Sequence, residues 1–408
     1  MSFPSGPSGP SALAHGAILS PFTELRRLLD GIEAGHEEPI DLTIGEPREA
    51  MPPFVADKIA EAAASFAKYP PIRGTEELRN AIAEWIAQRY GPAAAIDPAR
   101  EVLPLNGSRE GLFYAAFLAV GRKQVKGRPA ILMCNPYYGA YIGAAMAVDA
   151  EPVFLNATEA TGHLPDLDEI ADDKALLDRT AAVYLCSPAN PQGAVASPAY
   201  IGRALELARA HDFMLFFDEC YSEIYSAEPP PGALQVAAAT PERFDNLVVF
   251  NSLSKRSNLP GLRSGFCAGD AKFLQTFAEI RNLVAPQMPG PTQHASAAVW
   301  REEAHVIANR QAYREKYDVC DIHLKGRYGH RRPAGGFFLW LDVTNFGGSG
   351  EAAVTLWKYC GVKVLPGAFL AQVGRDGTNP GKEYVRLALV HDAVTVGKAL
   401  ERFVEVLA

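Results

Sequence analysis

Four short segments in the middle of the chain carry residues that could do covalent chemistry together. Each follows directly after an apolar run, and the four are Asn135-Pro136-Tyr137-Tyr138, Ser187-Pro188-Ala189-Asn190-Pro191, Asp218-Glu219-Cys220-Tyr221 and Asn251-Ser252-Leu253-Ser254-Lys255. A lysine can form an imine with an aldehyde, and a buried aspartate requires a cationic partner. Amides, hydroxyls and aromatic rings can hold the rest of a flat ligand. Chemistry at a single site requires the fold to bring these segments together.

The apolar runs themselves predict buried strands of a mostly parallel sheet. The runs are AILMC (130–134), AAVYLC (181–186), FMLFF (213–217), NLVVF (246–250) and GFCAG (265–269). Their apolarity is continuous rather than alternating, which is typical of strands covered on both faces. Helical patterns lie between them, for example at 197–211 and 270–283, so strands and helices alternate. Ligands of such sheets bind at the carboxyl ends of the strands, where the four polar segments begin.

Together the groups at this edge match the requirements of pyridoxal phosphate. This phosphorylated ring needs an amine for its Schiff base, an acid that keeps its ring nitrogen protonated, an aromatic face and donors for its phosphate. The sequence supplies each of these groups. Motifs for a dinucleotide, a P-loop, a GxSxG nucleophile or an HExxH zinc site do not occur, and the histidines show no metal spacing, so we expect no metal.

The order of the elements predicts two domains. A well-signalled helix spans 75–91, helices follow at 291–325, and short strands and helices alternate to a last amphipathic helix from about 392. We therefore expect an α/β fold with a large domain at 51–290 and a smaller α+β domain from 17–50 and 291–408. Residues 1–16, rich in Gly, Pro and Ser, have neither a basic start nor an apolar run and are expected to be a flexible lead rather than a signal peptide.

The segment SLSK with Gly261 and Arg263 resembles the lysine signature of the class I/II pyridoxal-phosphate aminotransferases. The resemblance extends from IGEP at 44 to YVRLAL at 384 and implies the type I fold of these enzymes. Ser264 departs from the signature, which usually carries an aliphatic residue there. This departure indicates a divergent subgroup.

The resemblance implies a role for each polar residue around the ring. Lys255 would carry the cofactor and then move a proton between the substrate Cα and the cofactor C4′. Asp218 would pair with the ring nitrogen, and Asn190 and Tyr221 would hydrogen-bond the phenolic oxygen of the ring. A nucleophilic lysine also requires burial and cationic neighbours, for which Arg263 is one candidate. We further expect the Asn190–Pro191 bond to be cis.

Three sources of donors are expected for the phosphate. The segment NGSREGLFYAAFLAV at 106–120 begins a helix, and the backbone N–H groups of Ser108 and Arg109 lie in its first turn, where an anion is favoured. Ser252 adds a hydroxyl group. Arg263 adds a guanidinium, which can bind a phosphate through two parallel hydrogen bonds.

The remaining expected positions surround the ring and the substrate. Tyr138 would stack on the ring, with Tyr137 as the alternative. Arg386 lies inside an apolar strand, a costly position unless it meets a carboxylate, and the resemblance implies that it binds the substrate α-carboxylate. Gly45 would contribute backbone to the same carboxylate. Tyr69 resembles the tyrosine that reaches the phosphate in the neighbouring subunit, which implies a homodimer with shared active sites.

The implied activity is transfer of an amino group between an amino acid and a 2-oxo acid by a ping-pong mechanism. SLSKRSNLPGLRSGF, DECYSEIY and PAGGFFLWLD resemble the N-succinyldiaminopimelate aminotransferases of lysine biosynthesis, which use glutamate as donor. A second substrate carboxylate would require a further cation, and the candidates are Arg48, Arg73 and Arg256. The alternatives are a broader aspartate, alanine or aromatic aminotransferase, and a carbon–sulfur lyase or a decarboxylase on the same fold. A non-catalytic sensor half of a transcription regulator would need a DNA-binding domain, for which the expected lead leaves no room.

Bulk composition argues against nucleic-acid and membrane partners, and we expect small-molecule amino acid and 2-oxo acid substrates. The 408 residues are 48% hydrophobic and 21% charged, as in ordinary globular proteins, and the formal net charge of −8 argues against nucleic-acid or anionic-membrane partners. No run of about 18 apolar residues offers a membrane span. The six cysteines form no CxxC pair and are expected to be reduced core thiols, which favours a cytoplasmic location.

Overall fold

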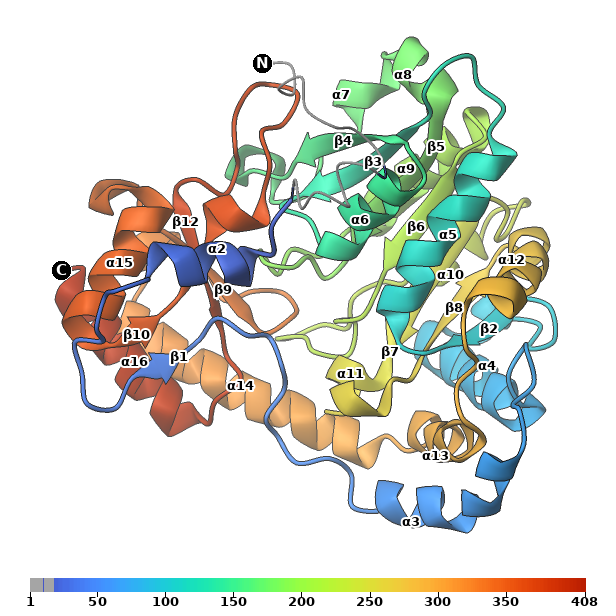
Figure 1. The fold of residues 1–408 in the computed structure, drawn as a ribbon, viewed down its shortest axis with the longest axis horizontal. Helices are drawn as coiled ribbons and strands as arrows, with labels where there is room; N and C mark the ends of the chain where they lie inside the picture. The colour runs from blue at the N-terminus through green and yellow to red at the C-terminus, as the bar shows by residue number, and fades with distance from the viewer. Residues whose placement is uncertain (1–9, 11–17) are drawn as a thin grey trace.

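The computed structural model describes residue 10 and residues 18–408, and its largest element is a seven-stranded sheet (Figure 1). Its strands are β2 (Val102–Leu105), β3 (Ala130–Asn135), β4 (Glu151–Asn156), β5 (Thr180–Cys186), β6 (Met214–Asp218), β7 (Leu247–Ser252) and β8 (Gly265–Gly269). The spatial order is β2-β8-β7-β6-β5-β3-β4. β8 runs antiparallel to both neighbours and all other pairs are parallel, which confirms the predicted mostly parallel sheet.

Helices cover both faces of this sheet. On one face lie α5 (Ser108–Arg122), α6 (Gly139–Ala147) and α12 (Ala271–Val284), whose apolar side chains form one core with the strands. On the other face lie α4 (Glu76–Tyr90), α9 (Pro198–Ala210), α10 (Ala233–Ala237) and α13 (Gly290–Arg301), which form a second core. The central strands are therefore buried on both sides, and this burial explains their unbroken apolar sequence.

Local capping signals set the ends of the predicted helices. The Thr75 side chain accepts a hydrogen bond from the Leu78 N–H at 3.3 Å at the start of α4, and Gly91 follows its end with a φ of 89°. Ser197 caps α9 and Asp270 caps α12 in the same way. The helices predicted at 75–91, 197–211 and 270–283 thus agree with the structure to within a residue or two.

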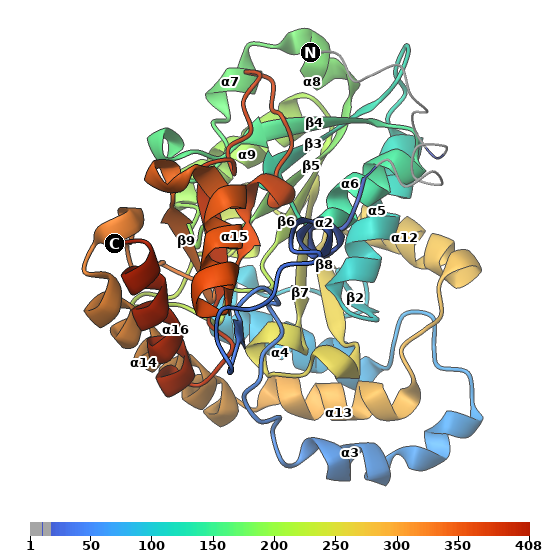
Figure 2. The same cartoon turned by 60° about the vertical axis from the view of Figure 1, so that its left-hand side comes forward.

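A second group of elements packs beside the large sheet (Figure 2). It contains an antiparallel sheet in the order β11-β12-β9, formed by β9 (Phe338–Asp342), β11 (Leu365–Pro366) and β12 (Tyr384–Ala388), and a parallel pair of β1 (Ile40–Asp41) with β10 (Val362–Lys363). Its helices are α14 (Ala304–Leu324), α15 (Gly348–Cys360) and α16 (Ala393–Val406). These strands and helices share a separate core, which supports our proposal of two domains.

Further short helices complete the part of the chain that the structure describes. They are α2 (Pro21–Leu28), α3 (Val55–Glu61), α7 (Asp168–Ala171), α8 (Lys174–Arg179) and α11 (Leu253–Arg256). α13, placed beyond the proposed boundary at residue 290, shares a core with α4, and α14 continues from it toward the second group of elements (Figure 1). The predicted lead at 1–16 lies, Pro10 excepted, outside the described residues.

Two further observations bear on the expectations from composition. None of the helices in residues 18–408 has the length and apolarity that crossing a membrane requires. The six cysteines are all buried and free.

Candidate active site

The carboxyl ends of β5, β6 and β7 bring the predicted polar residues together. Asp218 ends β6, Ser252 ends β7, and Lys255 lies on α11 immediately after β7. Asn190 follows β5 in a loop whose Asn190–Pro191 bond is cis, as expected. This edge of the sheet faces the second group of elements, which contributes Arg386 from β12.

Lys255 sits in a partly buried position between the two groups of elements. Its Nζ donates a hydrogen bond to the Gly45 carbonyl and lies 5.4 Å from the centre of the Phe337 ring. Burial is the main cause that lowers the pKa of the Lys255 amine to about 8. The nearby cations Arg386 and Arg109 contribute to this lowering, while Cys220 and Glu46 oppose it. These two arginines therefore act as the cationic neighbours, whereas the sequence had suggested Arg263. A large share of Lys255 is consequently neutral and nucleophilic near pH 8.

Asp218 is a buried carboxylate without a cationic partner. Its Oδ2 accepts a hydrogen bond from the Tyr141 hydroxyl at 2.8 Å, and its Oδ1 accepts one from the Cys220 N–H at 3.1 Å. No Lys, Arg or His side chain within residues 18–408 forms an ion pair with it. Burial raises the pKa of the Asp218 carboxyl above its ordinary value, and these hydrogen bonds oppose the rise. A cationic ligand group placed here would supply the missing partner.

Arg386 is a buried cation that forms no ion pair with any carboxylate of residues 18–408. Its Nη2 donates to the Thr43 carbonyl at 2.6 Å and its Nη1 to Asn190 Oδ1 at 3.3 Å, while its Nε has no hydrogen-bond partner. Burial lowers the pKa of the Arg386 guanidinium to about 10. The guanidinium also lies 4.5 Å from the centre of the Phe338 ring. Such a guanidinium suits the carboxylate of a ligand.

Asn190 connects this arginine to Tyr221. The Nδ2 of Asn190 donates to the Tyr221 hydroxyl at 3.4 Å, while its Oδ1 accepts from Arg386. Tyr221 is buried against Phe337 and Phe338 in edge-to-face contacts. Burial raises the pKa of the Tyr221 phenol, so its hydroxyl stays protonated and can donate a hydrogen bond.

Gly45 leaves no room for a side chain. A Cβ atom there would lie 2.7 Å from Phe338 Cζ, and its carbonyl accepts the hydrogen bond from Lys255. This close approach explains why the position needs glycine, and it brings the Gly45 backbone beside the amine of Lys255.

The expected anion donors converge where β7, β8 and α5 meet. Ser108 begins α5, and its Oγ lies 3.1 Å from the Cys220 Sγ, which in turn lies 3.7 Å from the Ser252 Oγ. Arg263 donates to the Asn106 carbonyl at 3.2 Å and pairs with no carboxylate of the described residues. A Cβ on Gly265 would lie 3.1 Å from the Ser108 backbone nitrogen, so the chain packs tightly around this helix start. Two hydroxyl groups, the guanidinium of Arg263 and a helix N-terminus form a donor set that suits a phosphate.

The tyrosine pair at 137 and 138 divides between two environments. Tyr138 precedes α6, accepts a hydrogen bond from Arg109 Nε at 2.5 Å and has the Arg109 guanidinium 5.3 Å from its ring centre. Tyr137 packs on Phe154, and its hydroxyl bonds Gln372 at 3.2 Å. This difference favours Tyr138 as the stacking residue.

The candidates for a partner subunit and for a second carboxylate make contacts other than those described above. Tyr69 is fully exposed, as a residue that completes a neighbouring subunit's site would be in one chain. Arg48 bonds His391 at 3.1 Å, and Arg73 contacts the Arg100 carbonyl at 3.4 Å. Arg256 is wrong as a candidate, because both Nη atoms of its buried guanidinium already donate to Glu303 and to backbone carbonyls.

Sequence reasoning missed two residues that touch the predicted centre. Tyr141 hydrogen-bonds Asp218, and Cys220 lies between the hydroxyls of Ser108 and Ser252. Tyr141 lies three positions after Tyr138, in the first turn of α6, and this closeness in sequence to a predicted site residue could have identified it. Cys220 lies two positions after Asp218, but its apolar surroundings in the sequence predict only a core thiol.

The residues fit the pyridoxal phosphate that the sequence resemblance implies. Lys255 supplies an amine with a lowered pKa, Asp218 a buried carboxylate without a cation, and the start of α5 a donor set for the phosphate. The buried charges of Asp218 and Arg386 both lack a counterion among the described residues, and a ligand could supply it. A protonated ring nitrogen and a substrate carboxylate would satisfy them.

Comparisons with known proteins agree with this geometry. Residues 37–403 match the family model described as aminotransferase class I and II. The LL-diaminopimelate aminotransferase of Nitratidesulfovibrio vulgaris is 30% identical over 372 residues, which cover 89% of this chain and 90% of that relative.

Two solved structures illustrate the similarity of fold. An aminotransferase of Neisseria meningitidis is 38% identical with a TM-score of 0.89, covering 96% of this chain and 98% of that one. A probable N-succinyldiaminopimelate aminotransferase of Thermus thermophilus is 25% identical with a TM-score of 0.81, covering 95% and 100% of the two chains.

Proposed function

The chain belongs to the class I and II aminotransferases, which depend on pyridoxal phosphate. We propose that it transfers an amino group between N-succinyl-L,L-diaminopimelate and 2-oxoglutarate. The reaction would follow a ping-pong course in which one amino acid leaves as its oxo acid before the second oxo acid enters. In the direction of lysine biosynthesis, glutamate would be the donor. The name of the Thermus thermophilus neighbour and the charges of the site support this substrate.

Each residue of the site has a distinct task in this proposal. The bound cofactor supplies the electron sink that stabilises negative charge at the substrate Cα. Lys255 Nζ moves the proton at that carbon, Asp218 keeps the ring nitrogen protonated, and Arg386 binds the α-carboxylate. Asn190 and Tyr221 orient the ring, and Asn190 also positions Arg386 through their shared hydrogen bond.

The unpaired guanidinium of Arg386 is the observation that carries the aminotransferase assignment at this site. It lies close enough to Lys255 to lower the pKa of the lysine amine, so an α-carboxylate bound there would bring the α-amino acid to that amine. A buried arginine without a carboxylate is costly in a protein that binds no acid. The missing counterion of Arg386 therefore supports the proposal that an acid binds there.

The choice among diaminopimelate substrates rests on Arg109. This exposed arginine is near enough to Lys255 to lower its pKa, and it forms no ion pair with any described carboxylate. The distal end of N-succinyl-L,L-diaminopimelate carries two carboxylates, whereas the distal end of L,L-diaminopimelate carries one carboxylate and one ammonium. A free guanidinium at the mouth of the site favours the dianionic end and opposes the ammonium.

L,L-diaminopimelate itself is the second candidate. The curated relatives include LL-diaminopimelate aminotransferases at about 30% identity over nine-tenths of the chain, and this similarity is the observation that favours it. A broader aspartate, alanine or aromatic aminotransferase and a carbon–sulfur lyase share the same central residues. We also propose a homodimer in which the exposed Tyr69 reaches the phosphate of the partner subunit's site.

A substrate comparison tests the proposal. The purified protein is incubated with N-succinyl-L,L-diaminopimelate, L,L-diaminopimelate, aspartate, alanine or phenylalanine, each with 2-oxoglutarate, and kcat/KM is measured from glutamate formed. We expect the succinylated substrate to be preferred. Higher kcat/KM for any other substrate would contradict the proposal, and pyruvate and ammonia released without 2-oxoglutarate would identify a lyase.

An Arg109→Gln variant sharpens this test. We expect it to lower kcat/KM for the succinylated substrate about tenfold and to leave that for alanine within about twofold, because one exposed charge contact is worth roughly 1 kcal/mol. The matched control is Arg122→Gln, which removes the same charge at the opposite end of α5, where Arg122 contacts Met214. Equal losses in both variants would refute the role of Arg109.

A further inference from the structure

Asn309, on the helix α14, holds the backbone of the segment that carries Lys255. Its Nδ2 donates hydrogen bonds to the Lys255 carbonyl at 3.2 Å and to the Arg256 carbonyl at 3.3 Å. Both partners are acceptors, so the nitrogen of the amide and not its oxygen must face them. Asn309 is itself buried, with 5% of its surface exposed. The contact therefore joins two interior segments that are 54 residues apart.

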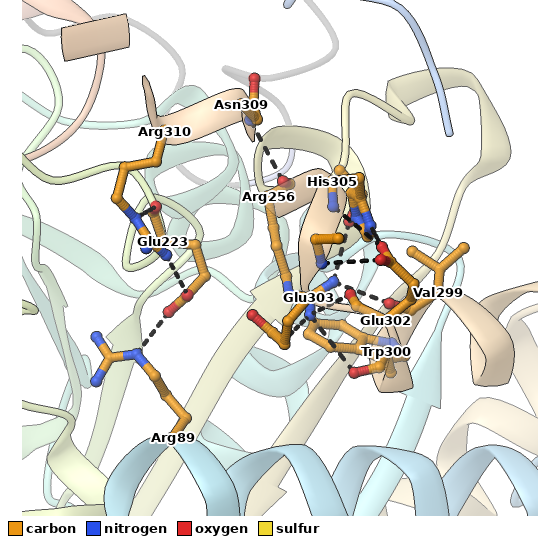
Figure 3. Close-up of polar contacts among 12 residues, drawn as sticks. Arg89, Glu223, Arg256, Val299, Trp300, Glu302, Glu303, His305, Asn309 and Arg310 are labelled. Carbon is orange, nitrogen blue, oxygen red and sulfur yellow. Dashed lines mark hydrogen bonds and ion pairs between the residues drawn. The ribbon is translucent and has the colours of Figure 1, made fainter. Parts of the chain in front are cut away.

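Arg256 also connects the segment of Lys255 to the end of α13 and to the residues just before α14. Its guanidinium donates to the Val299 carbonyl at 3.0 Å and the Trp300 carbonyl at 3.4 Å, which belong to the last turn of α13. It also donates to the Glu302 carbonyl at 3.3 Å and pairs with the Glu303 carboxylate (Figure 3). Arg256 thus caps the C-terminus of α13, where free carbonyls and the helix dipole favour a cation.

Arg310, the neighbour of Asn309, holds the other segment of the site. Its Nε donates to the Glu223 carbonyl at 3.0 Å and its Nη2 to the Glu223 carboxylate at 3.1 Å. Glu223 lies two residues after Tyr221 and five after Asp218. Consecutive residues of α14 therefore contact the segment of Lys255 and the segment of Asp218 (Figure 3).

The remainder of α14 lies in the second group of elements. Tyr313 stacks on Phe337 at 5.3 Å between ring centres, and Phe337 is the ring that faces Lys255 Nζ. Farther along, Tyr317 belongs to the core shared by β9, β12 and α16. One continuous helix thus connects that core to the backbone of the lysine.

We propose that Asn309 is a positioning residue for Lys255, which fixes the lysine backbone relative to α14 and, through Arg310, relative to the segment of Asp218 and Tyr221. The inference rests on the role proposed for Lys255 as the reacting amine. Without the two hydrogen bonds, the one-turn helix α11 loses its only side-chain donors from α14 among the described residues. The amine would then sample positions nearer to water.

Chemical labelling of Lys255 in the cofactor-free, full-length chain tests this proposal. Wild type and Asn309→Leu are acetylated with limiting acetic anhydride between pH 6 and 11, and the labelling of Lys255 is read by mass spectrometry of peptides. Leucine is used rather than aspartate because a new carboxylate would raise the lysine pKa through its charge alone. Gln311→Leu is the matched control, since Gln311 lies on the exposed face of the same helix and bonds only Glu315.

We expect the titration midpoint of Lys255 to rise by at least about one pH unit in Asn309→Leu, toward the value of about 10.4 for a free lysine. Labelling at pH 8 would then be about fivefold slower than in wild type, and kcat of the cofactor-loaded enzyme would fall. Gln311→Leu should keep the wild-type midpoint. An unchanged midpoint in Asn309→Leu would overturn the proposal, even if its thermal stability fell, because stability alone does not move this titration.

A second variant covers the case in which leucine prevents folding. Asn309→Ala removes the same donors without adding bulk, and the same rise in midpoint is expected. If neither variant folds, Asn309 is required by the fold itself and the proposal of a positioning role is rejected. The labelling is independent of any substrate, so its outcome is separate from the choice of N-succinyl-L,L-diaminopimelate.

Discussion

The charged residues around Lys255 fall into two groups, one with counterions within the chain and one without. One group, which we call the framework cluster, consists of Arg89, Glu223, Arg256, Glu303 and Arg310, and every charge in it has a counterion (Figure 3). Asp218 and Arg386 form the other group. Both are buried, and neither has a counterion among the described residues.

The presence or absence of a counterion distinguishes charges that stabilise the fold from charges that we expect to bind a ligand. A buried charge is tolerated only when an opposite charge or several hydrogen bonds compensate for lost hydration. The framework cluster obtains this compensation within the chain, so it should contribute to stability whether or not a ligand is bound. Asp218 and Arg386 can obtain full compensation only from outside. Variants of the two groups should therefore differ in whether stability or activity is lost.

Glu223→Gln should produce the largest loss of stability. Glu223 is bonded by Arg89 Nε at 2.6 Å and by Arg310 Nη2 at 3.1 Å, and its side chain is almost fully buried. Glutamine keeps the shape but leaves two buried cations without a counterion, which costs about 3–5 kcal/mol. The measurement is the free energy of unfolding of the cofactor-free chain in urea.

A surface pair provides the control for this variant. Glu84 bonds Arg301 at 2.7 Å with both side chains exposed, so Glu84→Gln should cost less than about 1 kcal/mol. If the two variants lost equal stability, the framework cluster would not differ from a surface ion pair.

Arg386→Met should show the opposite behaviour. The variant loses the guanidinium that is expected to bind the α-carboxylate. We expect kcat/KM to fall about 10²–10³-fold, because the substrate carboxylate would be left without its buried counterion. Its unfolding free energy without cofactor should stay equal to that of wild type or increase, because an uncompensated buried cation is removed. Arg386→Lys would serve as a second variant that keeps the charge and loses the guanidinium. A loss of stability with kcat/KM unchanged would reverse our assignment of this residue.

The sequence predicted the features that depend on local patterns. Asp218 and Ser252 could be placed because a buried strand shows as an unbroken apolar run and the residues at its end follow directly. The two strands of the seven-stranded sheet that were not predicted, β2 and β4, contain Pro104 and Pro152 and lie at its edges. Proline cannot donate a hydrogen bond in a central strand, but an edge strand accommodates it. A proline within a short apolar run is therefore compatible with a strand at the edge of a sheet.

Contacts between distant segments could not be predicted. Arg256 was a candidate for a substrate carboxylate because nothing local shows that α13 ends against its guanidinium. Glu223 is 134 residues from Arg89 and 87 from Arg310, so its partners appear only in the folded chain. Arg386 could be assigned because an arginine in an apolar strand is unusual by itself, whatever its partner.

Glu219 allows the smallest of these effects to be measured as a function of pH. This glutamate lies beside Asp218 and is fully buried, with hydrogen bonds from the Tyr90 hydroxyl at 2.6 Å and the Ala233 N–H at 2.7 Å. Burial raises the pKa of the Glu219 carboxyl from 4.5 to about 7. A raised pKa means that the folded chain keeps a proton that the unfolded chain releases between about pH 4.5 and 7. The stability due to this proton is complete below about pH 4.5 and is lost as the pH rises through 7.

The lost stability would amount to at most about 3.5 kcal/mol, since one pKa unit corresponds to about 1.4 kcal/mol. Glu219→Gln should remove this pH dependence, because glutamine stays neutral and can accept the Ala233 bond. Urea unfolding of wild type and variant at pH 5, 6, 7 and 8 measures the difference directly. Asp218, whose pKa is raised in the same direction, is present in both chains and cancels, and Lys255 titrates near pH 8, at the upper end of this range. A constant difference in unfolding free energy from pH 5 to 8 would show that Glu219 is ionised throughout and that Arg89 acts as its counterion.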